Sequence, residues 1–197
     1  MMYTLPNMLT LSRIVAIPVI VAIFYLPVEW NFLVASLIFI AAALTDLFDG
    51  YLARKLNQTT KLGAFLDPVA DKLIVAVALI LLVEVYASPW MAIPAIVIIG
   101  REIIISALRE WMAECGHRAQ VAVSNIGKVK TVIQMFAISM VLMVDPIHLV
   151  TGGDVFWRCV WWIGVILLYI ATVLTLWSAY IYLKAAWPNL MNADGEE

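Results

Sequence analysis

Residues 160–176, VWWIGVILLYIATVLTL, contain no formal charge. Two other uncharged runs precede them, LIVAVALILLV at 73–83 and VIQMFAISMVLMV at 132–144. A helix that crosses the hydrocarbon core of a bilayer needs about 20 largely apolar residues. Of all 197 residues, 64% are hydrophobic and 13% are charged, whereas soluble domains carry roughly 25% charged residues. The sequence therefore predicts an all-α, polytopic bundle of membrane helices that forms one domain over residues 1–197.

Polar residues and Pro or Gly clusters divide the chain into six predicted transmembrane helices. These spans are 9–26, 31–54, 67–86, 90–112, 126–144 and 158–184. The opening residues 1–13 mix apolar side chains with Asn7, Thr10 and Arg13, which is typical of a short interfacial segment. We therefore expect this N-terminal segment to lie along the membrane surface before the first helix.

Lys and Arg are absent from three predicted connections, at 27–30, 87–89 and 145–157. The other connections and both ends of the helical region carry Lys or Arg, and the positive-inside rule places these at the cytoplasmic face. Both termini are then cytoplasmic, in agreement with an even number of spans. The formal net charge of −2 gives no indication of a nucleic-acid partner.

Four acids lie where the second span ends and the third begins: Asp46, Asp49, Asp67 and Asp71. Within each pair the spacing is three or four residues, so each pair shares a helix face. The short intervening loop returns the chain to the same side of the membrane. We therefore expect all four carboxylates to meet at the cytoplasmic rim.

Clustered carboxylates repel one another unless cations neutralise them. Their hard oxygen atoms favour Mg²⁺, Mn²⁺ or Ca²⁺, and two divalent ions would balance four charges. The alternative is structural: the acids cap helices or pair with Arg54, Lys55, Lys61 and Lys72. Caps do not need four acids at membrane depth, where a carboxylate costs about 2.5–3.5 kcal/mol on insertion scales, so the metal site is the stronger prediction.

Small residues accompany the acids at fixed spacing. The combined pattern reads Asp46-x2-Asp49-Gly50-x2-Ala53-Arg54-x8-Gly63-x3-Asp67-x3-Asp71. It resembles the complete signature of the CDP-alcohol phosphatidyltransferase family at all eight fixed positions. Four further segments resemble the family members that use glycerol 3-phosphate: 5–13, 62–72, 101–111 and 127–131. The resemblance implies a bacterial inner-membrane enzyme, and a homodimer, that transfers the phosphatidyl group of CDP-diacylglycerol to sn-glycerol 3-phosphate and releases CMP.

The resemblance also implies roles for individual residues. All four Asp residues surround two divalent cations, Mg²⁺ or Mn²⁺, which hold the diphosphate of the CDP-lipid, and Asp71 is in addition the base that accepts the alcohol proton. The expected CDP-lipid contacts come from Gly50, Ala53, Arg54 and Gly63. For Ala53 the alternative role, as a small residue that lets helices pack closely, stays open.

The acceptor phosphate requires cations, and four basic residues are candidates for binding it: Arg101, Arg109, Lys128 and Lys130. Arg109 is the favoured ligand because it lies nearer the cytoplasmic face. For Arg101 a buried ion pair with Glu102 is the structural alternative. Lys128 and Lys130 are two apart on a helix and point to different sides, so we expect at most one of them to enter the pocket.

Two other classes of protein bring acids into membrane helices. A membrane prenyltransferase typically has two separate Asp-rich motifs, whereas this chain has one compact unit. A divalent-cation transporter requires acids along a continuous path. Besides the cluster, the spans contain Glu102 at depth, with Glu84 and Glu110 near span ends. Another acceptor, such as serine, inositol phosphate or a second phospholipid, is the remaining alternative within the family.

Overall fold

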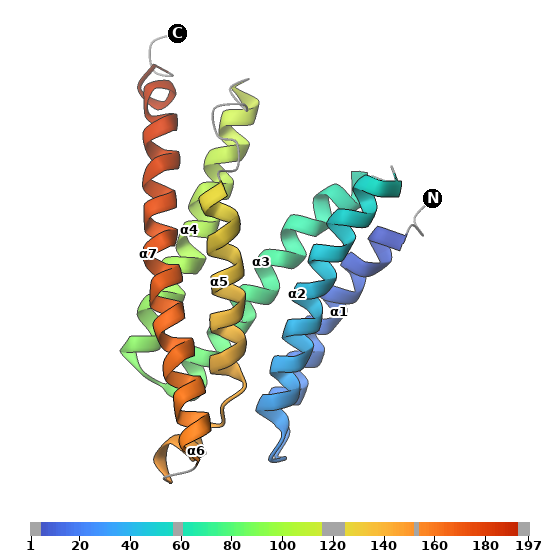
Figure 1. Cartoon of the computed structure of the whole chain (residues 1–197). Coiled ribbons are helices and arrows are strands. Elements are labelled where there is room, and N and C mark those ends of the chain that lie inside the picture. The colour runs from blue at the N-terminus through green and yellow to red at the C-terminus, as the bar shows by residue number, and fades with distance from the viewer. Residues whose placement is uncertain (1–4, 57–60, 116–124, 152–153, 193–197) are drawn as a thin grey trace.

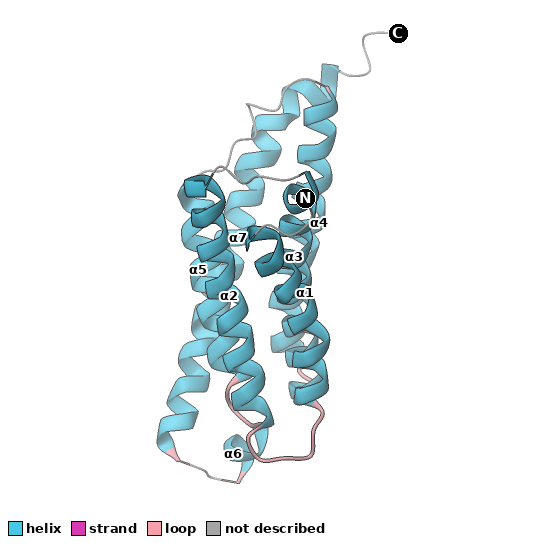
Figure 2. Ribbon diagram, turned by 90° about the vertical axis from the view of Figure 1, so that its right-hand side faces the viewer, coloured by secondary structure: helices cyan, strands magenta, loops and turns pink. Residues whose placement is uncertain are grey.

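The computed structural model describes residues 5–56, 61–115, 125–151 and 154–192. Within these ranges only the backbone is described at 5–6, 47–56, 61–62, 64, 125–128 and 189–192. The described residues form helices and short connections without any strand (Figure 2). The helices are α1 (Leu5–Phe24), α2 (Asn31–Leu56), α3 (Lys61–Tyr86), α4 (Pro89–Glu114), α5 (Asn125–Leu142), α6 (Pro146–Val150) and α7 (Val155–Asn192). The predicted all-α class is confirmed.

The long helices run up and down the bundle in sequence order (Figure 1). α1 begins at the end of the bundle where α7 finishes, and α6 lies at the opposite end. Among the described residues, three helices are long and apolar enough to cross a membrane, with spans at Asn7–Phe24, Pro89–Glu114 and Val155–Pro188. Shorter apolar stretches lie in α2 and α5. The exact number of six crossings stays a prediction.

The helices pack as two groups that meet along one seam (Figure 1). In one group α1 packs on α2 and α3, and in the other α7 packs on α4 and α5. The groups meet where α2 packs on α5 and where α3 packs on α4 and α5. Small buried residues such as Ala35, Ala78 and Ala137 let neighbouring helices approach closely. Large apolar side chains such as Ile96 and Val173 are exposed on the outer surface, as expected of a bundle that faces lipid.

α1 differs from the sequence prediction at its start. It runs unbroken from Leu5 to Phe24, so residues 5–13 are its first turns and form no separate interfacial segment. The polar residues Asn7, Thr10 and Arg13 are buried and lie three apart, which places them along one face of the helix. This face packs towards α2 and α3, and the polar side chains therefore face the interior of the bundle.

α3 and α4 are joined by a very short connection at one end of the bundle. Ala87 has a φ of 43°, a left-handed conformation that reverses the chain within two residues. Ser88 then caps α4, and its hydroxyl accepts a hydrogen bond from the backbone N–H of Trp90. Pro89 follows as the first helical residue, where it needs no backbone hydrogen bond. The tight turn makes α3 and α4 antiparallel neighbours.

Candidate functional site

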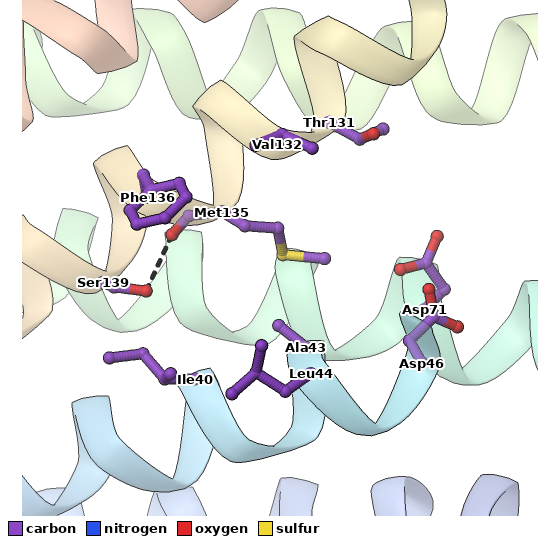
Figure 3. A pocket seen from close by; sticks show the side chains of 10 residues that line it. All are labelled: Ile40, Ala43, Leu44, Asp46, Asp71, Thr131, Val132, Met135, Phe136 and Ser139. Carbon is purple, nitrogen blue, oxygen red and sulfur yellow. Dashed lines mark hydrogen bonds between the residues drawn. The ribbon is translucent and has the colours of Figure 1, made fainter. Parts of the chain in front are cut away.

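Three of the predicted acids are described, and they lie together at the end of the bundle where α2 finishes and α3 begins. Asp46 comes from α2, and Asp67 and Asp71 come from α3. Figure 3 shows the carboxylates of Asp46 and Asp71 directed towards the same region. For Asp49 and for three predicted CDP-lipid contacts, Gly50, Ala53 and Arg54, only the backbone in α2 is described.

Arg13 of α1 joins two of these acids. Its guanidinium pairs with the Oδ1 atom of Asp46, and its Nη2 atom lies 3.5 Å from Oδ1 of Asp67. The hydroxyl of Thr10, one turn earlier on α1, donates a hydrogen bond to the same oxygen of Asp67. We call Arg13, Asp46, Asp67 and Asp71 the acidic site. In the described residues Arg13, and not Lys72, is the cation paired with these acids.

A cavity of about 210 Å³ opens beside the acidic site, between α2, α3 and α5. Asp46 and Asp71 line one end of it together with Thr131. Apolar side chains of α2 and α5 line the remainder: Ile40, Ala43, Leu44, Val132, Met135 and Phe136. Ser139 lies at the far end, where its hydroxyl donates to the backbone carbonyl of Met135 (Figure 3). The α2–α5 cavity is therefore charged at one end and apolar along its length.

Basic residues gather on the other group of helices. The Nζ atom of Lys130 on α5 lies 2.6 Å from Oε1 of Glu102 on α4. The Nη1 atom of Arg101 is 2.8 Å from the same oxygen, and its Nη2 atom donates to the hydroxyl of Ser178 on α7 at 2.9 Å. Glu102 therefore joins α4 to α5, and Arg101 joins α4 to α7. Arg101 also has the ion pair with Glu102 that the structural alternative predicts.

Arg109 has a different environment. Its Nη2 atom donates to the hydroxyl of Tyr182 at 2.9 Å, and among the described side chains no carboxylate lies within ion-pair distance of it. We call Arg101, Arg109 and Lys130 the basic site. Lys130 is 1% exposed, so it faces the bundle interior, and the side chain of Lys128 lies outside the described residues.

The two sites adjoin across the seam between the helix groups. Lys72, which follows Asp71 on α3, donates from Nζ to the hydroxyl of Ser106 on α4 at 2.5 Å. Ser106 in turn donates to the backbone carbonyl of Glu102 at 2.5 Å. Thr131, which lines the α2–α5 cavity, is next to Lys130 in sequence. A molecule held by the carboxylates would therefore have the basic site beside it.

Among the described side chains, no three or more His, Cys, Asp or Glu are grouped as metal ligands. The side chain of Asp49 is not one of those described. Even so, the described donors fit a hard divalent cation in kind, because they are carboxylate oxygens from two adjacent helices. The pairing of Arg13 with Asp46 and Asp67 indicates that this concentration of negative charge attracts a cation. Gly63, the predicted CDP-lipid contact that is described, is buried near the start of α3.

Sequence reasoning overlooked three residues of this arrangement: Thr10, Arg13 and Tyr182. The spacing of Thr10 and Arg13 in an otherwise apolar segment was a usable signal, because a polar face on a membrane helix points to the protein interior. Tyr182 gave no signal, since aromatic residues near helix ends are common at membrane interfaces.

Comparison with known proteins gives a consistent result. The sequence model described as "CDP-alcohol phosphatidyltransferase" matches residues 3–181. A protein of Escherichia coli strain K12, named CDP-diacylglycerol–glycerol-3-phosphate 3-phosphatidyltransferase, is 51% identical over 195 residues, which cover 98% of this chain and 100% of the relative. Proteins of the same name from Shigella sonnei and Shigella boydii match with the same identity and coverage.

Proposed function

The chain belongs to the CDP-alcohol phosphatidyltransferase family, and we propose that it transfers the phosphatidyl group of CDP-diacylglycerol to sn-glycerol 3-phosphate. The products are phosphatidylglycerophosphate and CMP, and the reaction is a step of phospholipid biosynthesis. The family assignment argues against the prenyltransferase and the cation-transporter alternatives. The identity of the relatives over their whole length favours glycerol 3-phosphate over serine, inositol phosphate or a second phospholipid.

The observation that carries the proposal is the shape and polarity of the α2–α5 cavity. A CDP-lipid has a diphosphate at one end and acyl chains at the other. The cavity offers Asp46 and Asp71 at one end and apolar walls from α2 and α5 along its length. A lipid with its diphosphate near the acids therefore places its apolar part along the membrane-facing helices, which matches the two chemical halves of the substrate.

We propose that Asp46, Asp49, Asp67 and Asp71 hold two divalent cations, Mg²⁺ or Mn²⁺. Such ions supply charge neutralisation at the diphosphate and at the departing CMP. The carboxylate donors of the acidic site suit these hard ions. Gly50, Ala53, Arg54 and Gly63 are the proposed contacts for the CDP part of the substrate, where small residues let a nucleotide approach the backbone.

Asp71 is the proposed general base. It lines the cavity and lies one turn beyond Asp67 on α3, so its carboxylate faces the space in which the acceptor hydroxyl would approach. Asp71 accepts the hydroxyl proton as the acceptor oxygen forms a bond to the phosphorus of the phosphatidyl group. The bond between that phosphorus and the oxygen of CMP breaks, and CMP leaves with the electron pair.

The basic site is the proposed binding site for the acceptor phosphate. Arg101, Arg109 and Lys130 bring three positive charges together, and Glu102 neutralises one of them. A phosphate dianion would balance the remaining charge. The hydrogen bond from Lys72 to Ser106 brings this site next to Asp71, which is the position the acceptor hydroxyl must reach. Lys128 is a further candidate ligand for the same phosphate.

The helix arrangement also supports a proposal for location. The helices make this a membrane protein, and we propose the bacterial inner membrane with both termini and the acidic site at the cytoplasmic face. α1 begins at the end of the bundle where α7 finishes, and the acids lie at this end. Cytoplasmic placement gives the site access to water-soluble glycerol 3-phosphate. A homodimer stays a prediction.

The decisive experiment is an assay of the purified full-length protein in detergent or lipid nanodiscs. CDP-diacylglycerol is incubated with glycerol 3-phosphate, serine, inositol phosphate or phosphatidylglycerol in turn, and the lipid product is identified by mass. We expect phosphatidylglycerophosphate and stoichiometric CMP with glycerol 3-phosphate. A product with another alcohol would change the acceptor, and the absence of CMP release with every alcohol would contradict the proposed reaction.

A further inference from the structure

One tyrosine of α7 contacts two arginines of α4. The hydroxyl of Tyr182 accepts a hydrogen bond from Nη2 of Arg109 at 2.9 Å. The Cζ atom of Arg109 lies 5.0 Å from the centre of the Tyr182 ring, and that of Arg101 lies 5.7 Å from it. Both distances are within the range of cation–π attraction. Tyr182 is 5% exposed, so its ring is fixed by packing.

The packing around Tyr182 is a small core of its own. Ile105, Leu108 and Met112 of α4 pack with Tyr182 and Ala186 of α7, apart from the main core of the bundle. These apolar contacts restrict the rotamers of the tyrosine. A rigid ring with a polar tip can then hold the flexible side chain of Arg109 in one position.

The chemistry of this contact differs from that at the acidic site. Arg13 is held by carboxylates, which neutralise its charge, whereas Tyr182 is neutral. Among the described side chains no carboxylate lies within ion-pair distance of Arg109, so its charge is not neutralised there. Arg109 is therefore held in place by a neutral partner, and its positive charge is left for an anion. This is the arrangement that recognition of a phosphate by arginine requires.

We propose that Tyr182 is a positioning residue of the acceptor site, which holds the guanidinium of Arg109 ready for the phosphate of glycerol 3-phosphate. This inference rests on the proposed function. Tyr182 acts through Arg109 and takes no part in bond formation. Its loss should therefore raise the acceptor KM and leave kcat and the KM for CDP-diacylglycerol nearly unchanged.

Two substitutions separate the contributions of the hydroxyl and the ring. Tyr182→Phe removes the hydrogen bond and keeps the ring, and we expect the acceptor KM to rise about three- to tenfold. Tyr182→Leu removes both contacts, and we expect a rise of about ten- to thirtyfold. Tyr180→Phe is the matched control, because Tyr180 lies on the same helix and is 58% exposed. This control should leave both KM values unchanged.

A double-variant cycle tests whether Tyr182 works through Arg109. In an Arg109→Ala background, Tyr182→Phe should have no further effect on the acceptor KM, because the group that it positions is gone. Independent, additive effects in that background would overturn the proposal. So would an equal rise of both KM values, or a loss of thermal stability in Tyr182→Phe with unchanged kinetics.

The same measurements distinguish this inference from the proposed function. If the unmodified protein makes no product from glycerol 3-phosphate, the proposed acceptor is wrong and so is the phosphate role of Tyr182. If the unmodified protein makes phosphatidylglycerophosphate but Tyr182→Phe retains the normal acceptor KM, the reaction stands and the positioning role alone fails. Kinetics with each substrate varied in turn, on full-length variants in nanodiscs, give both answers.

Discussion

Arg13 of α1 pairs with Asp46 of α2 across 33 residues of sequence. The arginine side chain is 1% exposed, and it also lies 3.5 Å from Asp67 of α3 through its other terminal nitrogen. One cation thus connects the first three helices at the acidic site. A fixed positive charge beside carboxylates affects both the cohesion of these helices and the affinity of the carboxylates for other cations.

Arg13→Gln tests both effects. We expect the variant to be less stable by about 1–3 kcal/mol, because the buried arginine loses its ion pairs with two partly exposed carboxylates. The carboxylates then repel each other without a cation between them. We also expect the Mg²⁺ concentration for half-maximal activity to fall, since a competing cation has been removed. Thermal unfolding in detergent and Mg²⁺ titration measure the two quantities. Unchanged values in both would mean that Arg13 is unimportant to the site.

Substitution of the acids tests the metal site directly. Asp46→Asn, Asp49→Asn and Asp67→Asn should each remove most turnover without preventing membrane insertion, because the charge that holds the cations at the diphosphate is lost. Activity of the unmodified protein should depend on Mg²⁺ or Mn²⁺. The assay is CMP release with and without chelator, after confirming the fold of each variant. Full activity in excess chelator would contradict the two-cation proposal.

Asp71→Asn should separate binding from turnover. The amide fills the same space in the cavity and cannot accept the alcohol proton, so we expect CDP-lipid binding to persist while transfer is lost. Binding of labelled CDP-diacylglycerol and CMP release are the two measurements, with Asp46→Asn as the comparison. If both variants lose binding equally, Asp71 acts chiefly as a metal ligand and the base lies elsewhere.

Gly164 of α7 lies where this helix packs tightly against α5. A Cβ atom there would lie 2.8 Å from Cγ2 of Val141 and 3.1 Å from the backbone nitrogen of Val141. Gly164→Ala should therefore destabilise the protein by about 1–3 kcal/mol through overpacking. Gly100→Ala is the matched control, because a Cβ at that helical position meets nothing within 4 Å. Thermal unfolding should show a loss for Gly164→Ala and none for Gly100→Ala.

The positions of the helices were largely predictable because hydropathy reports what faces lipid. Their ends were less so: α3 begins at Lys61 and α7 continues past Lys184 to Asn192, whereas the predictions began at 67 and ended at 184. The apolar span ends where charged residues begin, because these lie outside the hydrocarbon region. The helix itself can continue into the polar layer, since its backbone hydrogen bonds do not depend on lipid. Hydropathy thus locates the apolar part of a helix better than its ends.

The candidate site was predictable where its residues are close in sequence. The spacing of Asp67 and Asp71 gives their shared face directly. The partner of Asp46 is Arg13 of α1, and the partner of Arg109 is Tyr182 of α7. These residues are far apart in sequence, so the spacing of residues within one helix does not predict their contact. Arg13 was predicted to belong to an interfacial segment along the membrane surface, and its burial follows from the packing of α1 against α2 and α3.

Acceptor recognition provides the last prediction, because Arg109 has a neutral partner in Tyr182. Arg109→Ala should raise the KM for glycerol 3-phosphate about ten- to hundredfold, since hydrogen bonds to charged groups contribute roughly 1.5–3 kcal/mol, and should change the KM for CDP-diacylglycerol little. Arg109→Lys should recover only part of the loss, because lysine keeps the charge but lacks the two-pronged contact. Steady-state kinetics with each substrate varied in turn measure these effects on folded variants. An unchanged acceptor KM would move the phosphate site to Arg101, Lys128 or Lys130, and equal losses for both substrates would make Arg109 a packing residue.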